Sequence, residues 1–122
     1  MNFEKSLTLV PTKKPSMRNP VVERREKMLR KLNRQIELVH LERKGEKISR
    51  PWFWTDEQGH IYVHIKYGKH VLELGKGKFS IQCSSMDEVI SSLETIIGEV
   101  KKGSLDEMLT EVSKDIRTNF GH

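Results

Sequence analysis

Four cations in the first third of the chain recur at helical spacing and could hold a phosphate backbone. They are separated by three, four and three residues, which places them on one face of an α-helix. The four are Arg24, Lys27, Lys31 and Arg34. Cations aligned in this way neutralise a nucleic-acid backbone and release its counterions. The alternative is a solubilising helix face, whose cations pair with nearby glutamates.

A second set of candidate binding residues combines aromatic rings with cations. In the sheet predicted below, Phe53 and Tyr62 lie opposite each other on the outer face of the first hairpin. Rings on an open sheet face can stack bases while neighbouring cations hold phosphates. The other members of this set are His64, Lys66, Lys69, Lys76 and Lys78. The alternative is that the N-terminal helix covers this face, so that the rings form a second small core.

Other chemistry finds little support in the sequence. His60 and His64 are four residues apart on a predicted strand, about 13 Å from each other, which is too far for a shared metal ion. The glycine-lysine segment 75–78 lacks the pattern of a phosphate-binding loop and joins two strands. The single cysteine, Cys83, excludes an intrachain disulfide. We therefore expect no catalytic residues, no metal and no cofactor, and a protein that is not an enzyme.

Length and composition favour one small cytoplasmic domain. The chain has 122 residues, of which 35% are hydrophobic and 32% charged, with a formal net charge of +5. No apolar run approaches the roughly 20 residues that span a bilayer, and the N-terminus lacks the apolar region of a secretory signal. The net charge is +8 over residues 1–51, +1 over 52–83 and −4 over 84–122. This asymmetry favours an anionic partner or self-association of opposite ends.

The first third of the chain is predicted to be an arm followed by one long helix. Residues 1–18 form an extended, basic arm with a short strand at 7–10, and residues 19–122 form a single domain. Asn19 and Pro20 favour a helix start, and Gly45 can end that helix near Lys44. One face of this helix carries an apolar stripe that needs a partner. The stripe consists of Val22, Leu29, Leu32, Ile36 and Val39.

Residues 50–83 are predicted to form a four-stranded antiparallel meander. The strands are 52–55, 60–67, 70–74 and 79–83, and they are joined by turns of four, two and four residues. With these turn lengths, Trp54 lies opposite Ile61 and Trp52 lies opposite Val63. Large apolar side chains from all four strands then share one face, so both tryptophans are expected to point inward and Phe53 outward.

Two helices are predicted in the last third of the chain, and each follows a capping box. Ser85 and Glu88 begin the first helix, which Gly103 ends, and Ser104 and Glu107 begin the second. We expect the helix that begins at Ser85 to cover the tryptophan face of the sheet. The second, acidic helix is expected to pack on the basic helix or on a second copy of the chain. The fold class is therefore α+β: an N-terminal helix, a four-stranded antiparallel meander and two C-terminal helices.

Short motifs across residues 19–106 resemble a family of small uncharacterised bacterial and prophage proteins. The motifs are Asn19-Pro20-Val21, Arg24-Arg25, Arg50-Pro51-Trp52-Phe53-Trp54, Tyr67-Gly68-Lys69, Leu72-Glu73-Leu74, Gly77-Lys78 and Gly103-Ser104-Leu105-Asp106. This resemblance implies no assigned activity. In topology alone, the predicted ββββα unit is similar to the single-stranded-DNA-binding folds of positive cofactor four, Whirly and Pur-alpha proteins.

These observations favour a non-catalytic nucleic-acid-binding protein that prefers single-stranded DNA or RNA. The competing hypothesis is a small accessory protein of mobile-element origin. Such a protein would bind or inhibit a protein partner through the basic helix or the acidic C-terminal helix. A third possibility is a homodimer in which free apolar stripes pair. Exposure of Phe53 and Tyr62 favours base stacking. If the N-terminal basic helix covers them instead, a protein partner is favoured.

Overall fold

The structure of this chain is a computed structural model that describes residues 3–14 and 19–120, with side chains for 5–14 and 19–114. Within these residues it has an α+β fold, as the sequence predicts. In chain order the elements are α1 (Phe3–Ser6), α2 (Pro20–Arg43), β1 (Phe53–Thr55), β2 (Ile61–His64), β3 (Lys66–Tyr67), β4 (His70–Val71), β5 (Ser80–Cys83), α3 (Met86–Lys102) and α4 (Asp106–Phe120).

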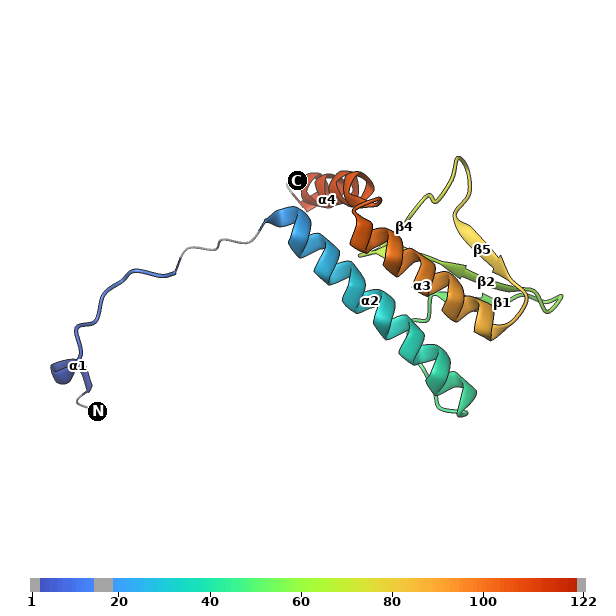
Figure 1. Ribbon diagram of the computed structural model, residues 1–122, viewed down its shortest axis with the longest axis horizontal. Helices are drawn as coiled ribbons and strands as arrows, with labels where there is room; N and C mark the ends of the chain where they lie inside the picture. Colours follow the sequence, from blue (N-terminus) through green and yellow to red (C-terminus); the bar gives the residue numbers. More distant parts are fainter. Residues whose placement is uncertain (1–2, 15–18, 121–122) are drawn as a thin grey trace.

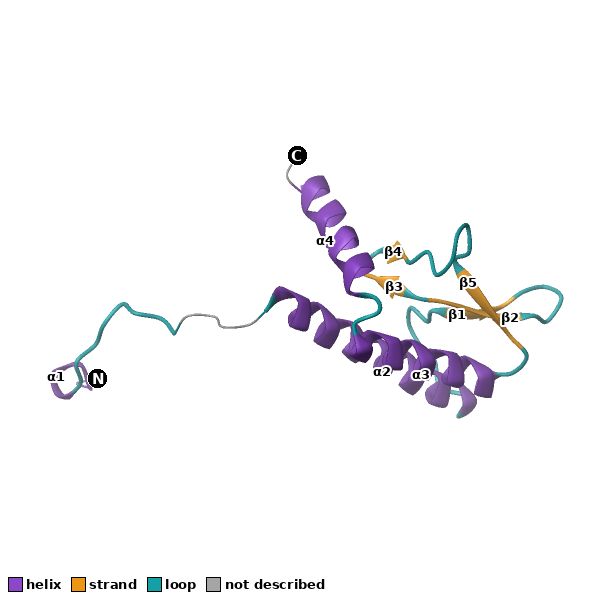
Figure 2. Cartoon of the chain, turned by 45° about the horizontal axis from the view of Figure 1, so that its top comes forward, coloured by secondary structure: helices purple, strands orange, loops and turns teal. Residues whose placement is uncertain are grey.

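The helices α2 and α3 form a layer against one face of the three-stranded sheet. α2 and α3 lie side by side and antiparallel (Figure 1), and β2 and β5 pack against α3. Figure 2 shows the sheet on one side of this helix pair, and none of the described helices crosses the other face of the sheet. α4 packs against the N-terminal part of α2. One face of the sheet therefore belongs to the core and the other faces solvent.

A single apolar core fills the space between the helix pair and the sheet. Its side chains come from α2, the strands, α3 and the start of α4. The largest fully buried ones are Met28, Leu32, Ile65, Leu72, Leu93, Leu109, Val39, Val63, Val89 and Val100. Burying a side chain of this kind stabilises a fold by roughly 1.5–3 kcal/mol. The core thus fixes the position of α2 relative to α3, the strands and α4.

Helix α2 begins as the sequence predicts and ends one residue before the expected Lys44. The Asn19 side-chain oxygen accepts a hydrogen bond from the Val21 amide at 2.8 Å, and Pro20 occupies the first helical position. The buried face is rotated slightly from the predicted stripe, because Val22 is 43% exposed. The buried residues of α2 are Met28, Leu32, Gln35, Leu38 and Val39.

The arm differs from the sequence prediction in its local structure. Its first residues form the single helical turn α1, and the expected strand at 7–10 is wrong. Leu7, Leu9 and Val10 are all more than half exposed. A strand is stabilised by its ladder of hydrogen bonds to a neighbour. Because none of the described strands pairs with this segment, its apolar residues do not form one.

The expected four-stranded meander is also wrong. β1, β2 and β5 form a three-stranded antiparallel sheet in the order β1-β2-β5, whereas β3 and β4 form a separate two-stranded sheet. The two-residue turn at 68–69 is confirmed, since Tyr67 pairs with His70 around it. β5 then pairs with β2 and not with β4. The two sheets therefore share one continuous stretch of chain, which runs through β2 and β3.

Seven residues explain why the meander fails. The Leu72 amide donates to the Ile65 carbonyl at 2.8 Å, so Ile65 still pairs with the segment after β4. The residue before it, His64, pairs with Ser80 of β5. Residues 73–79 are thus looped out between the two ladders. Within the loop, Gly75 bridges to Lys78 around a turn of two residues instead of the expected four. This excursion replaces the expected direct pairing of strands 70–74 and 79–83.

The first hairpin has a different register from the predicted one. Its loop contains three residues, 57–59, because a type I turn from Asp56 is followed by Gly59 at a φ of 84°. A four-residue loop was expected, and the loss of one loop residue moves every residue of β1 to the other face. Phe53 pairs with Val63 and is 5% exposed, whereas Trp54 pairs with Tyr62 and is 41% exposed. The expected inward Trp54 and outward Phe53 are therefore both wrong.

Candidate functional site

The described residues form a groove beside α2. It lies between that helix, the segment 49–52 and the turn that joins β3 to β4, and its volume is about 920 Å³. Its lining residues are Lys27, Arg30, Lys31, Arg34, Gln35, Leu38, Ser49, Arg50, Pro51, Trp52, Lys66, Gly68 and Lys69. Seven of these side chains are cationic and none is a carboxylate. We call this surface the cationic groove.

The helical wall of the cationic groove follows from the periodicity of α2. Lys27, Arg30, Lys31 and Arg34 occupy positions i, i+3, i+4 and i+7, which form one face of a helix. At 1.5 Å per residue, this cationic face is about 10 Å long. The core contacts of Met28 and its neighbours hold the helix in one rotational setting. The cations are therefore presented along a line and not scattered around the helix.

The opposite wall is tied to α2 by one buried amide. Gln35 is 5% exposed, and its Oε1 accepts a hydrogen bond from the Trp52 amide at 2.8 Å. Its Nε2 donates to the Arg50 carbonyl at 3.4 Å. Arg50 has a φ of 56°, in the left-handed region that non-glycine residues rarely adopt. These contacts place Arg50 and the buried Trp52 against the helical cations.

The positive charge of the groove is crowded and largely uncompensated. The pKa of Lys31 is lowered below its ordinary value, first by burial and then by the nearby charges of Lys27 and Lys66. The Lys27 ammonium lies 5.4 Å from the centre of the Tyr67 ring. Among the described residues, no carboxylate pairs with Arg30, Lys31, Lys66 or Lys69. An anion entering the groove would relieve this repulsion.

The structure brings together only part of the predicted set of binding residues. The cationic groove unites Lys27, Lys31 and Arg34 of α2 with Lys66 and Lys69 of the second hairpin. The sequence analysis missed the remaining lining cations, which are Arg30 and Arg50, and it missed the role of Trp52. Arg30 lies three residues after Lys27, so helical spacing alone could have included it. Only the fold brings Arg50 to the same place.

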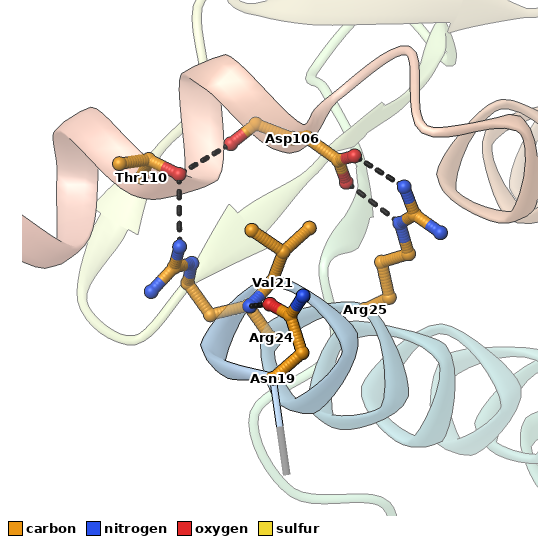
Figure 3. Close-up of polar contacts among 6 residues, drawn as sticks. All are labelled: Asn19, Val21, Arg24, Arg25, Asp106 and Thr110. Carbon is orange, nitrogen blue, oxygen red and sulfur yellow. Dashed lines mark hydrogen bonds and ion pairs between the residues drawn. The ribbon is translucent and has the colours of Figure 1, made fainter.

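Arg24 does not line the groove, because α4 engages it. Its Nη2 donates to the Thr110 hydroxyl at 3.0 Å (Figure 3). Next to it, Arg25 forms a two-pronged ion pair with Asp106, with Nε donating to Oδ1 at 2.8 Å. Hydrogen bonding from Arg25 lowers the pKa of Asp106 below its ordinary value. The predicted contact between the basic helix and the acidic helix therefore exists within one chain.

Five further residues of the predicted set lie outside the groove lining, and three of them are described first. Lys76 and Lys78 belong to the excursion at 73–79, and neither lines the cationic groove. Phe53 faces the core and cannot present its ring to a ligand. It therefore cannot stack a base beside Tyr62, as the sequence analysis expected.

The open face of the sheet carries a different set of rings from the predicted one. Trp54 stacks on Tyr62 with ring centres 5.6 Å apart and an angle of 26° between the planes. The Trp54 ring also lies 5.1 Å from the His64 ring at an angle of 58°. We call Trp54, Tyr62 and His64 the aromatic row. Tyr62 and His64 were predicted to lie on this face, and Trp54 replaces Phe53 beside them.

Other chemical groups in the described part of the chain are sparse. No group of three or more His, Cys, Asp or Glu side chains is arranged to hold a metal ion there. Cys83 is 4% exposed, and burial raises the pKa of its thiol, which disfavours the reactive thiolate. None of the described helices combines the length and apolarity needed to span a bilayer.

Comparison with family models, curated proteins and solved structures gives no match for this chain. The resemblance to small bacterial and prophage proteins thus stays a prediction. The geometry of the cationic groove and the aromatic row is the basis for any functional argument.

Proposed function

We propose that this chain is a non-catalytic nucleic-acid-binding protein of the cytoplasm that prefers single strands. In this proposal the cationic groove holds the sugar-phosphate backbone. The observation that carries it is the set of seven Lys and Arg side chains around a groove without a carboxylate. Lysine and arginine contacts to phosphate supply most of the affinity of non-specific nucleic-acid binding.

The extent of the groove supports a polymer and not a small anion as the ligand. The cationic face of α2 is about 10 Å long, and Arg50, Lys66 and Lys69 add charge on the other sides. One phosphate would neutralise two or three of these cations and leave the others repelling each other. A backbone with successive phosphates can reach all of them. An unpaired strand is favoured because only unpaired bases can stack on the exposed rings beside the groove.

Titration of a labelled 12-nucleotide oligothymidine, followed by fluorescence anisotropy at two salt concentrations, tests this proposal. The groove variant carries Arg30→Gln, Lys31→Gln and Lys66→Gln. The control variant carries Lys44→Gln, Lys47→Gln and Lys101→Gln, which removes the same charge from exposed positions outside the groove. Both variants are first checked for an unchanged circular dichroism spectrum and melting temperature.

We expect the groove variant to lose about 100-fold in affinity at low salt and the control variant to lose less than about threefold. The slope of log affinity against log salt should also fall by about 2 in the groove variant, since each phosphate contact contributes about 0.7 for single strands. Equal losses in the two variants would mean that net charge, and not the groove, governs binding. Absence of binding by the unchanged protein at low salt would overturn the proposal.

The competing hypothesis of a protein partner differs in the ligand that it predicts for the groove. On that hypothesis the partner binds the basic helix or the acidic C-terminal helix. Arg24 and Arg25 of α2 already bind Thr110 and Asp106 of α4, so the cations of the groove would make the contact. An interaction with a protein that survives nuclease treatment and is lost in the groove variant would favour this hypothesis. The same variant measured with the oligonucleotide therefore separates the two functions.

A further inference from the structure

We propose that the aromatic row is a base-stacking site and that it takes unpaired bases of the same strand whose backbone lies in the cationic groove. This inference rests on the proposed function and names the residues that recognise the substrate. It assigns the main stacking surface to Trp54, with Tyr62 and His64 as its support. The substrate class is a single strand with accessible bases.

Exposure of the row is the first argument. Trp54 is 41% exposed on the sheet face that none of the described helices covers (Figure 2). Leaving a large apolar ring in water forfeits the stabilisation that burial would give. Tyr62 and His64 hold this ring in one orientation through the stacked and tilted contacts described above. The indole is thus an exposed surface of the kind on which a base stacks.

The second argument is that His64 and Lys66 connect the row to the groove. The His64 amide donates to the carbonyl of Trp52, a groove residue, at 2.9 Å. Along the strand, the buried residues Val63 and Ile65 alternate with partly exposed His64 and Lys66. Lys66 therefore lies on the same side as the row and also lines the groove.

Electrostatics agrees with this connection. Burial, and then the charge of Lys66, lower the pKa of His64 below its ordinary value, and the same lysine lowers the pKa of Lys31 in the groove. Lys66 is thus close enough to both surfaces to act on each. A strand that passes Lys66 can keep phosphates in the groove while its next bases reach the aromatic row.

A structural explanation for the row must be separated from a functional one. Aromatic pairs across antiparallel strands stabilise a hairpin without any ligand. Trp54 and Tyr62 form such a pair. Protein stability therefore cannot separate the two explanations. The property that can is whether affinity depends on the presence of bases when the backbone charge of the ligand is constant.

The experiment compares a 12-nucleotide oligothymidine with an abasic strand of the same length and charge. Affinities are measured by anisotropy for the unchanged protein, for Trp54→Leu and for Phe79→Leu. Phe79 is the matched control, because it is 46% exposed and belongs to the excursion outside the row. Binding is also followed by quenching of the intrinsic tryptophan fluorescence, which needs no variant.

We expect the unchanged protein to bind oligothymidine about tenfold or more tightly than the abasic strand, since each stacked base contributes on that scale. Trp54→Leu should remove most of this ratio, and Phe79→Leu should leave it intact. Oligothymidine, but not the abasic strand, should quench the tryptophan fluorescence.

Equal affinity of the unchanged protein for both strands would overturn the base-stacking site while leaving the groove proposal in place. Failure to bind either strand would instead overturn the proposed function, and the inference with it. Should Trp54→Leu unfold, the ratio and the quenching in the unchanged protein still decide the question.

Discussion

The cations at the two ends of the basic segment 24–34 of α2 have different surroundings, although the residue types at both ends are alike. At the N-terminal end, Arg24 and Arg25 are bound by Thr110 and Asp106 of α4. One turn further on, Lys27 and the next cations line a groove without a carboxylate. The comparison shows that a basic stripe is a structural contact where the fold supplies acceptors, and a candidate ligand site where it does not.

The chemistry of the two ends explains why they are not interchangeable. The planar guanidinium of Arg25 matches the two oxygens of Asp106, a geometry that lysine cannot reproduce. Thr110 completes this contact, since its hydroxyl accepts from Arg24 and donates to the Asp106 carbonyl at 2.8 Å. In the groove, Arg34 pairs with Glu37, but both side chains are more than half exposed. Such a pair contributes little to stability and can open for a phosphate.

The largest expected effect comes from disrupting the packing of α4, which binds the N-terminal end of α2. Leu109 of α4 is 1% exposed, and Leu109→Ala should destabilise the fold by about 3 kcal/mol through the cavity it leaves. Urea denaturation measures this loss, with the exposed Glu107→Ala as the control. Under native conditions the affinity for oligothymidine should stay unchanged. A loss of less than about 1 kcal/mol would mean that α4 is not anchored by this residue.

The next effect compares the two ends directly at equal charge. Lys27→Gln/Lys31→Gln should lower the affinity for oligothymidine about tenfold or more, because both cations line the groove. Arg24→Gln/Arg25→Gln should change the affinity less than about threefold but lower the melting temperature, because both arginines hold α4. Anisotropy gives the affinity of each variant, and thermal unfolding gives its melting temperature. Similar affinity losses in the two pairs would refute the distinction between the ends.

A smaller effect tests the ion pair through its dependence on pH. The pKa of Asp106 is lowered below its model-peptide value of 3.8 by Arg25, so the carboxylate stabilises the folded state above that pH. This stabilisation is lost as the pH falls through the lower pKa of the folded protein. Asp106→Asn should therefore lower the melting temperature by a few degrees at pH 7, and the difference should shrink toward pH 2.5. A difference that does not vary with pH would contradict the ion pair.

The smallest effect sharpens the link between the groove and the aromatic row. Burial and Lys66 lower the pKa of His64 below 6.5, so its neutral form stabilises the fold near neutral pH, and this contribution falls as the pH drops through the lower value. Lys66→Gln should raise the pKa of His64, as measured by NMR titration, whereas Lys44→Gln should not. An unchanged His64 pKa in Lys66→Gln would separate the two surfaces.

Local signals predicted the starts of α2 and α3 well, because helix ends are determined by neighbouring residues. They did not predict α1, and α4 begins at Asp106, two residues after the Ser104 that was expected to begin it. Asn19 with Pro20, and Ser85 with Glu88, satisfy amide groups within one turn, so α2 and α3 begin where expected. The two-residue turn at 68–69 is equally local, and it too is confirmed. These features need no knowledge of the rest of the fold.

Sequence reasoning failed where one residue decided the register. The segment 56–59 fits a four-residue loop as well as a three-residue loop with a bulge at Gly59. The choice between them reverses Phe53 and Trp54, and local composition contains no information on it. The buried contact between Gln35 and Trp52 was missed for a related reason, since it joins residues 17 positions apart. Such contacts exist only once the core has placed α2 against the sheet.

The short loop at 57–59 also makes the molecule unusually sensitive to insertions and deletions. Connections at the surface ordinarily tolerate added residues, because they carry few packed side chains. Here a single added residue would restore the longer loop, turn the Trp54 indole into the core and expel Phe53 into water. Two added residues would preserve the orientation of both. Among natural relatives of this chain, we therefore expect length variation at this position to occur in even steps.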